Sequence, residues 1–201
     1  MHDEVTIVLL AGGRATRLPG KLALPIGDEP MLLRVHRQLT HSGHPCIVSV
    51  REELSASALV GLNAPFVLDE YIDAGPLGGL ASAAKRVLTP LLFAAAADLP
   101  NLDAHALEVL LRRYEGEMAG ASTAPQAIVP RHSNGDVEPL AALYDTQALR
   151  ASAERALRSG RRKVTEALVG LRVIYYDIPQ VEESRYLNVN TAEDFQNMKI
   201  S

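Results

Sequence analysis

Short apolar runs alternate with longer amphipathic segments along the first half of the chain. Because several of these runs are apolar without interruption, they are typical of strands buried on both faces of a sheet. The runs that predict strands are Val5–Leu10, Cys46–Val50, Phe66–Leu68, Leu91–Ala96, Ala127–Val129, Pro139–Tyr144 and Val173–Ile178.

Between these runs, apolar residues recur at helical spacing. They predict helices over Met31–Ser42, Ser55–Leu62, Leu77–Leu88, Asp103–Tyr114, Thr146–Ser159, Lys163–Leu168 and Ala192–Met198. Alternating strands and helices are typical of βαβ units, whose helices cover both faces of a parallel sheet. The pattern therefore predicts an α/β fold with a mostly parallel sheet.

The second half departs from this alternation. Asn134-Gly135 lies between the predicted strands Ala127–Val129 and Pro139–Tyr144, and Asn-Gly is a strong signal for a hairpin turn. We expect an antiparallel excursion or a lid there. The stretch 116–125 is interpreted as a surface loop, and nothing along the chain marks a second domain.

Composition narrows the classes of function. The 201 residues carry a formal charge of −4 and a pI near 5.9, without a surplus of Lys and Arg. We therefore expect no nucleic-acid partner, whereas a local cationic cluster could still hold a small anion. The segment Met1–Glu4 is acidic, and apolar runs such as Leu91–Ala97 are too short to cross a bilayer. We expect a cytoplasmic protein with no membrane partner.

The single cysteine, Cys46, has no disulfide partner and no CxxC spacing for zinc. We expect it to be a buried strand residue. The histidines are scattered, and His41 and His44 flank a Ser-Gly loop rather than sharing a helix face, so no zinc site is predicted.

The first predicted strand runs into Leu10-Ala11-Gly12-Gly13, and Arg14, Arg17 and Lys21 follow. Paired glycines at the carboxyl edge of a strand let the backbone approach a ligand and present N–H groups to phosphates. Nearby cations strengthen that interpretation over a plain turn with solvated charges. The spacing fits neither a P-loop nor a dinucleotide fingerprint.

Asp98-Leu99-Pro100 ends the strand Leu91–Ala96. A carboxylate at this position lies in the ligand crevice of an α/β sheet, so Asp98 is the predicted Mg²⁺ ligand. The alternative is a helix cap, but Asn101 and Asp103 are better placed for capping.

Two further segments carry candidate ligand contacts. Asp69 precedes a loop that contains Gly75-Pro76-Leu77-Gly78-Gly79, which could approach a base and a ribose, although Gly78 and Gly79 could equally be packing glycines. Near the carboxyl end, Asn188 and Asn190 offer amide side chains to a metal or a phosphate. Thr191 and Asp194 have the spacing of a capping box.

Together with Glu138-Pro139-Leu140, these motifs resemble the molybdenum cofactor guanylyltransferase family over nearly the whole chain. The resemblance implies one Rossmann-like nucleotide-binding α/β domain over residues 1–201. It also implies Mg²⁺ as cofactor and transfer of GMP from GTP to the phosphate of molybdopterin, with release of pyrophosphate. Molybdopterin or the molybdenum cofactor, and proteins that deliver or accept the cofactor, are the implied partners.

The resemblance also implies roles for particular residues. Lys21 would bind the nucleotide phosphates and Asp98 would hold magnesium. For the reaction itself we expect Arg17, Lys21 and Asp98 to be catalytic, with Arg17 and Lys21 stabilising the leaving pyrophosphate. Acceptor contacts would come from Glu138, Pro139, Asn188 and Asn190. Nucleotide contacts would come from Leu10, Ala11, Gly12, Gly13, Lys21, Asp69, Gly75, Pro76, Leu77, Gly78 and Asp98.

Some positions depart from the family pattern. Gly20 stands before Lys21, where the family usually has Asp, and Ser49-Val50-Arg51-Glu52 lacks the Asn that relatives tend to carry near the base. Cytidylyl- and sugar-phosphate nucleotidyltransferases share the first motif and are alternatives. They often have an aspartate where this chain has Asn188 and Asn190, which favours the molybdopterin branch. A non-catalytic nucleotide-binding subunit is a further alternative.

Overall fold

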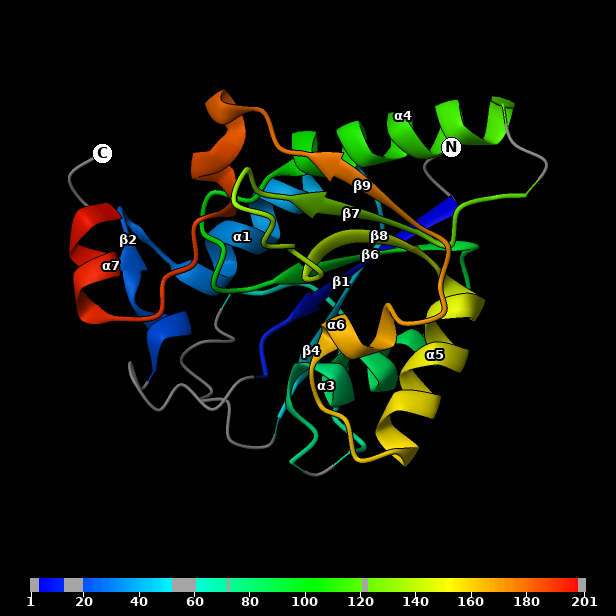
Figure 1. The fold of residues 1–201 in the computed structure, drawn as a ribbon. Helices are drawn as coiled ribbons and strands as arrows, with labels where there is room; N and C mark the ends of the chain where they lie inside the picture. The colour runs from blue at the N-terminus through cyan, green and yellow to red at the C-terminus, as the bar shows by residue number, and fades with distance from the viewer. Residues whose placement is uncertain (1–3, 13–19, 52–60, 72, 121–122, 199–201) are drawn as a thin grey trace.

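The computed structural model describes residues 4–12, 20–51, 61–71, 73–120 and 123–198. Within these residues the main sheet is built from β1 (Val5–Leu10), β4 (Cys46–Val50), β5 (Phe66–Leu68), β6 (Leu91–Ala96), β7 (Ala127–Arg131), β8 (Ala141–Asp145) and β9 (Val173–Asp177). Their order across the sheet is β5-β4-β1-β6-β8-β7-β9 (Figure 1). Neighbours pair in parallel, except that β8 pairs antiparallel with both β6 and β7. This confirms the predicted α/β fold and its antiparallel excursion.

Helices cover both faces of this sheet (Figure 1). They are α1 (Met31–Thr40), α3 (Gly75–Ala84), α4 (Ala104–Gly120), α5 (Thr146–Arg158) and α6 (Val164–Ala167). Side chains of β1 alternate between the faces, as strand geometry requires. Ile7 and Leu9 belong to the core cluster that includes α1 and α4, whereas Val8 and Leu10 belong to the cluster that includes α3, α5 and α6. None of the helices in the described part of the chain is long and apolar enough to cross a membrane.

The predicted bounds of β1, β4, β5 and β6 are confirmed, and Cys46 is buried in β4 as expected. Differences concern the second half and helix ends. β7 extends two residues past its predicted end, and β8 begins at Ala141 rather than Pro139. The Asn134-Gly135 turn is present, with Gly135 at φ +93° and the His132 amide donating to the Asp136 carbonyl at 2.8 Å.

Two helix predictions are corrected. α4 continues to Gly120, so the surface loop predicted from Gly116 is wrong in its first half; an i,i+4 ion pair between Arg113 and Glu117 at 2.7 Å supports the extra turns. α3 begins at Gly75 and ends at Ala84 rather than Leu88, where Arg150 binds the Ala84 carbonyl at 2.6 Å. The helix predicted over Ser55–Leu62 falls outside the described residues apart from its last two, which are not helical.

Short elements that the pattern did not predict complete the fold. They are the 3-10 helices η2 (Lys21–Ala23) and η3 (Gln180–Tyr186) and the hairpin of β2 (Pro25–Ile26) and β3 (Glu29–Pro30). The predicted bounds of α7 (Ala192–Met198) are confirmed. Ile26, Met31 and Val189 form a small core cluster, against which Leu22 and Phe195 pack. This cluster holds the carboxyl-terminal segment beside the hairpin, and Figure 1 shows α7 next to β2.

Candidate active site

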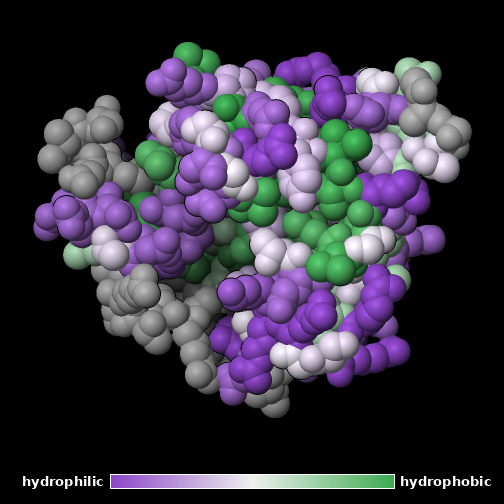
Figure 2. Space-filling view, in the orientation of Figure 1, coloured by the Kyte–Doolittle hydropathy of each residue, from purple (hydrophilic) through white to green (hydrophobic). Residues whose placement is uncertain are grey.

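One edge of the sheet gathers most of the predicted site. The carboxyl ends of the parallel strands meet there, and the antiparallel β8 begins there, which is where α/β sheets bind ligands. Each strand contributes one residue near this edge: it follows the strand in the parallel strands and in β7, and it precedes the strand in β8. In sheet order from β5 to β9, these residues are Asp69, Arg51, Gly12, Asp98, Glu138, His132 and Gln180. Figure 2 shows a hollow to the left of centre, on the side where these strands end, flanked by hydrophilic residues with hydrophobic residues at depth.

Lys21 lies at the middle of this edge. Its Nζ donates to Asp98 Oδ2 at 2.7 Å, to the Val189 carbonyl at 3.1 Å and to Asn190 Oδ1 at 3.2 Å. The side chains of Lys21 and Asp98 are 13% and 25% exposed, so water still reaches the pair. Lys21, Asp98 and Asn190, which were predicted from three separate motifs, therefore meet at the Lys21 ammonium group.

Backbone contacts hold these groups in register. The Val189 amide donates to the Asp98 carbonyl at 2.9 Å, and the Ala97 amide donates to the Leu10 carbonyl at 3.1 Å. Asp194 accepts from the amides of Asn190 and Thr191 at 2.9 and 2.8 Å, while the Asp194 amide donates to Thr191 Oγ1 at 3.1 Å. The predicted capping box is thus confirmed, and it fixes the segment that carries Asn190.

A buried carboxylate organises the other half of the edge. Asp69 Oδ1 accepts from Ser49 Oγ at 2.7 Å, and Oδ2 lies 3.6 Å from Arg51 Nε. Burial raises the pKa of Asp69, and the contacts with Ser49 and Arg51 oppose that rise. A Cβ on Gly12 would lie 2.9 Å from Arg51 Cγ, and one on Gly79 would lie 2.9 Å from Ser49 Oγ. The two glycines therefore make room for this cluster.

The loop and strand residues predicted to bind nucleotide fall into two groups. Gly75, at φ +62°, and exposed Pro76 begin α3, where a Cβ on Gly75 would meet the Arg162 carbonyl at 3.3 Å. The others are buried: Leu77 lies in the core, and Gly78 packs against Tyr71 and Ala74. Leu10 and Ala11 are also buried at the end of β1, so any contact that they make with a ligand would come from their backbone.

Sequence reasoning missed a cluster on the β7 side. His132 Nε2 lies 3.0 Å from Glu138 Oε1, and His132 Nδ1 lies 2.5 Å from Glu183 Oε2. Burial alone would lower the pKa of His132, but the contacts with Glu183 and Glu138 outweigh burial and raise it. Burial raises the pKa of Glu138, and the negative charge of Asp98 contributes to the rise. Glu138 therefore connects this cluster electrostatically with Asp98.

The remaining predicted residues are placed as follows. The Pro139 carbonyl accepts from the buried Tyr144 hydroxyl at 2.6 Å, which anchors the start of β8. Asn188 is exposed beside Val189. Gly13 and Arg17 lie outside the described residues. Among the residues that are described, no group of three or more His, Cys, Asp or Glu side chains could by itself hold a metal ion.

Comparison with known proteins identifies the family. Residues 7–173 match the MobA-like NTP transferase domain. The chain is 30% identical over 202 residues to a protein named as a probable molybdenum cofactor guanylyltransferase from Natronomonas pharaonis, with 96% of each chain covered. The chain belongs to the MobA-like NTP transferase family.

Solved structures agree with this assignment. Molybdopterin-guanine dinucleotide biosynthesis protein A from Archaeoglobus fulgidus superposes with a TM-score of 0.78 at 26% identity, and the match covers 97% of each chain. A cytidylyltransferase from Leptospira borgpetersenii shares the fold, with a TM-score of 0.76 at 17% identity over 98% of this chain and 85% of the other. The protein is thus a MobA-type nucleotidyltransferase, and its candidate active site lies at the edge of the sheet around Lys21 and Asp98.

The packing at Gly79 predicts an unusual response to alanine. In Gly79→Ala the new Cβ would lie 2.9 Å from Ser49 Oγ and 3.0 Å from Asp69 Oδ1. The resulting strain, about 1–3 kcal/mol, should exceed the helix-propensity gain of about 0.5–1 kcal/mol. Gly116→Ala is the matched control, because it lies in α4 with no atom within 4 Å of the new Cβ. Urea unfolding should show Gly79→Ala less stable and Gly116→Ala more stable than wild type; two stabilised variants would contradict the packing role.

The His132 cluster predicts a pH-dependent stability. Because the pKa of His132 is raised on folding, its contribution is fully present below the unfolded value of about 6.5 and is lost as pH rises through the folded pKa. The free energy of unfolding of wild type relative to His132→Gln should therefore fall across this window. Urea titrations of both proteins from pH 6 to pH 9 measure the difference, and a difference that stays constant with pH would contradict the assignment.

Proposed function

We propose that this protein transfers GMP from GTP to the phosphate of molybdopterin and releases pyrophosphate. The observation that carries the proposal is the contact of Lys21 with Asp98 and Asn190, because it unites the phosphate-loop, metal and acceptor motifs at one point. Membership of the MobA-like family and the names of the relatives from N. pharaonis and A. fulgidus support the same substrates.

The donor set around Asp98 fits Mg²⁺. Asp98 Oδ2 accepts a hydrogen bond from Lys21, while Asp98 Oδ1 accepts none from the described residues. Asn190 Oδ1 accepts a hydrogen bond from the same lysine. Mg²⁺ usually takes one or two carboxylates and completes its shell with water and substrate phosphates, so a three-carboxylate cage is not required. We propose that Asp98 holds the ion, with Asn190 beside it. When bound, Mg²⁺ would neutralise phosphate charge and polarise the reacting phosphorus.

The protein's own groups position the reactants. In the proposed reaction an acceptor phosphate oxygen attacks the α-phosphorus of GTP in line; the new P–O bond forms as the bond to the β-phosphate oxygen breaks, and pyrophosphate leaves with the electron pair. The acceptor phosphate is already ionised at neutral pH, so no general base is needed. Lys21, with Arg17 as a proposed partner, stabilises the charge on the leaving group.

The two substrates would approach from opposite sides of Asp98. We assign the nucleotide to the β1–β4–β5 side, where Gly12, Asp69 and the loop from Gly75 to Gly78 lie. We assign the acceptor to the β8 side, where Glu138 and Pro139 precede the strand, and to Asn188 and Asn190. In this arrangement the α-phosphorus and the acceptor phosphate would meet beside the Lys21–Asp98 pair.

Pyrophosphate release tests the proposal. The purified protein is assayed with Mg²⁺ and each of GTP, CTP, ATP and UTP, with and without molybdopterin. Release that requires both GTP and molybdopterin is the expected result. Turnover that prefers CTP, or that occurs with a sugar phosphate instead of molybdopterin, would reject the proposed substrates and retain nucleotidyl transfer. Nucleotide binding without any release would indicate a non-catalytic subunit.

The role of Asp98 predicts a separation of turnover from folding. Asp98→Asn removes the metal-binding charge but keeps the side-chain shape, so we expect pyrophosphate release to fall by at least about a hundredfold, in line with the loss of a key electrostatic stabiliser. The thermal unfolding temperature should change little. Asp28→Asn, in the exposed turn between β2 and β3, is the matched control and should keep full activity. Normal turnover in Asp98→Asn would remove this residue from the mechanism.

A further inference from the structure

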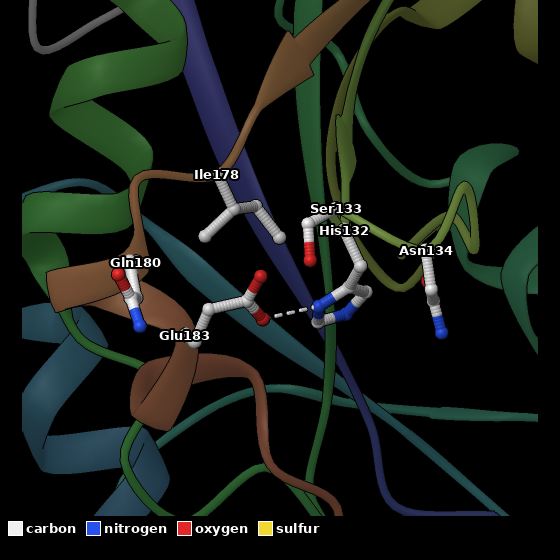
Figure 3. Close-up of a pocket in the computed structure, with 6 residues that line it drawn as sticks. All are labelled: His132, Ser133, Asn134, Ile178, Gln180 and Glu183. Atoms are coloured by element: carbon white, nitrogen blue, oxygen red, sulfur yellow. Dashed lines mark hydrogen bonds and ion pairs between the residues drawn. The ribbon is translucent and has the colours of Figure 1, made fainter.

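A cavity of about 570 Å³ lies at the carboxyl ends of β7 and β9, beyond the residues assigned above to either substrate. Figure 3 shows its wall, formed by the turn after β7, the end of β9 and the start of η3. The lining residues are His132, Ser133, Asn134, Ile178, Gln180 and Glu183. All but Ile178 carry hydrogen-bonding side chains, so the cavity offers a ligand hydrogen bonds as well as apolar contact.

Several of these polar groups are free to meet a ligand. Asn134 is used by its own turn: its Nδ2 donates to Asp136 Oδ2 and its Oδ1 accepts from the Asp136 backbone amide, both at 2.9 Å. In contrast, the side chains of Ser133 and Gln180 make no hydrogen bond to any described residue, and only one oxygen of Glu183 is engaged, by His132. Figure 3 shows the second Glu183 oxygen directed away from the imidazole.

His132 holds this wall and joins it to the site. Its two nitrogens contact Glu183 on the cavity side and Glu138 on the Asp98 side, so one ring fixes both carboxylates. Its edge packs against the buried ring of Tyr186, with centroids 6.2 Å apart and planes at 86°. These contacts hold the imidazole between the cavity and the Asp98 side of the site.

Charge differs between the two ends of this region. Around Lys21 a cation faces the position assigned to phosphates, whereas the cavity is lined by the Glu183 carboxylate beside His132, and Glu138 lies on the other side of that imidazole. The lining residues include no Lys or Arg and present a carboxylate oxygen, so the cavity disfavours a phosphate and favours N–H donors. An acceptor with a phosphate at one end and a donor-rich uncharged ring at the other has only one favourable orientation here.

We propose that this cavity binds the pterin ring of the acceptor, with Glu183 accepting hydrogen bonds from the ring N–H and amino groups and His132 positioning Glu183. The proposal rests on the proposed function, since molybdopterin is the substrate that carries both the phosphate and the ring. A 2-amino-4-oxo pyrimidine ring presents adjacent N–H donors, and the Glu183 oxygen that His132 does not contact can accept from them. Ser133 and Gln180 supply further polar contacts, and Ile178 supplies an apolar one.

Unsubstituted pterin, which lacks the phosphate, isolates this site. Its fluorescence anisotropy is followed as the full-length protein is added, for wild type, Glu183→Gln and Glu182→Gln. We expect saturable binding to wild type and a loss of at least about tenfold in affinity for Glu183→Gln, as for removal of a charged acceptor. Glu182→Gln is the matched control, because Glu182 contacts Tyr176 at 3.4 Å and His105 at 3.9 Å instead. It should bind pterin like wild type.

A second measurement follows pterin binding to wild type and uses a variant only to assign signals, so it does not depend on how Glu183→Gln folds. The side-chain NMR signals of His132, assigned by their absence in His132→Gln, should shift as pterin saturates the protein. Unchanged His132 signals, or equal pterin affinity in wild type and Glu183→Gln, would overturn the proposal. Displacement of pterin by saturating GTP would overturn it as well, because it would mean that the ring occupies the guanine position.

The proposed function can fail separately. If pterin binds through Glu183 but GTP and molybdopterin release no pyrophosphate, GMP transfer is rejected and the ring site stands. If pyrophosphate is released but pterin leaves the His132 signals unchanged, the ring site is rejected and GMP transfer stands.

Discussion

The ammonium group of Lys21 is the contact on which the rest of this edge depends. It has three N–H donors, and they are taken by Asp98, the Val189 carbonyl and Asn190. A phosphate that binds Lys21 must therefore replace one of these acceptors. The carboxyl-terminal segment does not rely on Lys21 alone, because the Val189 amide bonds Asp98 and Asp194 caps the next turn. Lys21 can thus turn toward a ligand without releasing the segment that carries Asn190.

The antiparallel strand β8 gives the site its second half. Because β8 runs against its neighbours, its first residues rather than its last lie at the ligand-binding edge. Glu138 is thereby placed between the end of β6, which carries Asp98, and the end of β7, which carries His132. The hydrogen bond from buried Tyr144 to the Pro139 carbonyl fixes the entry into β8. One reversed strand is enough to put a carboxylate where a parallel strand would have supplied a loop.

The sequence predicts the parts of this arrangement that follow from local pattern and one topological rule. Predominantly apolar runs predicted the bounds of β1, β4, β5 and β6. The common edge of parallel strands placed Lys21 and Asp98 in one predicted site. The strands β2 and β3 are too short to show a periodicity. The contact between His132 and Glu183 spans 51 residues, and a lone histidine gives no signal of its distant partner. His132 joins the site through tertiary packing, which the sequence pattern does not reveal.

The glycines at this edge act through the space they leave as much as through their backbone freedom. Gly12 does not have a positive φ; a Cβ there is excluded by Arg51 and Asp69, and a Cβ on Gly79 is excluded by Ser49 and Asp69. The half of the edge that we assign to the nucleotide is therefore closely packed around the Asp69 carboxylate, which Ser49 and Arg51 contact. The half that we assign to the acceptor includes an open cavity with unengaged polar groups. Close packing favours recognition of one rigid base, whereas an open polar cavity makes selectivity depend on which hydrogen bonds the ligand can supply.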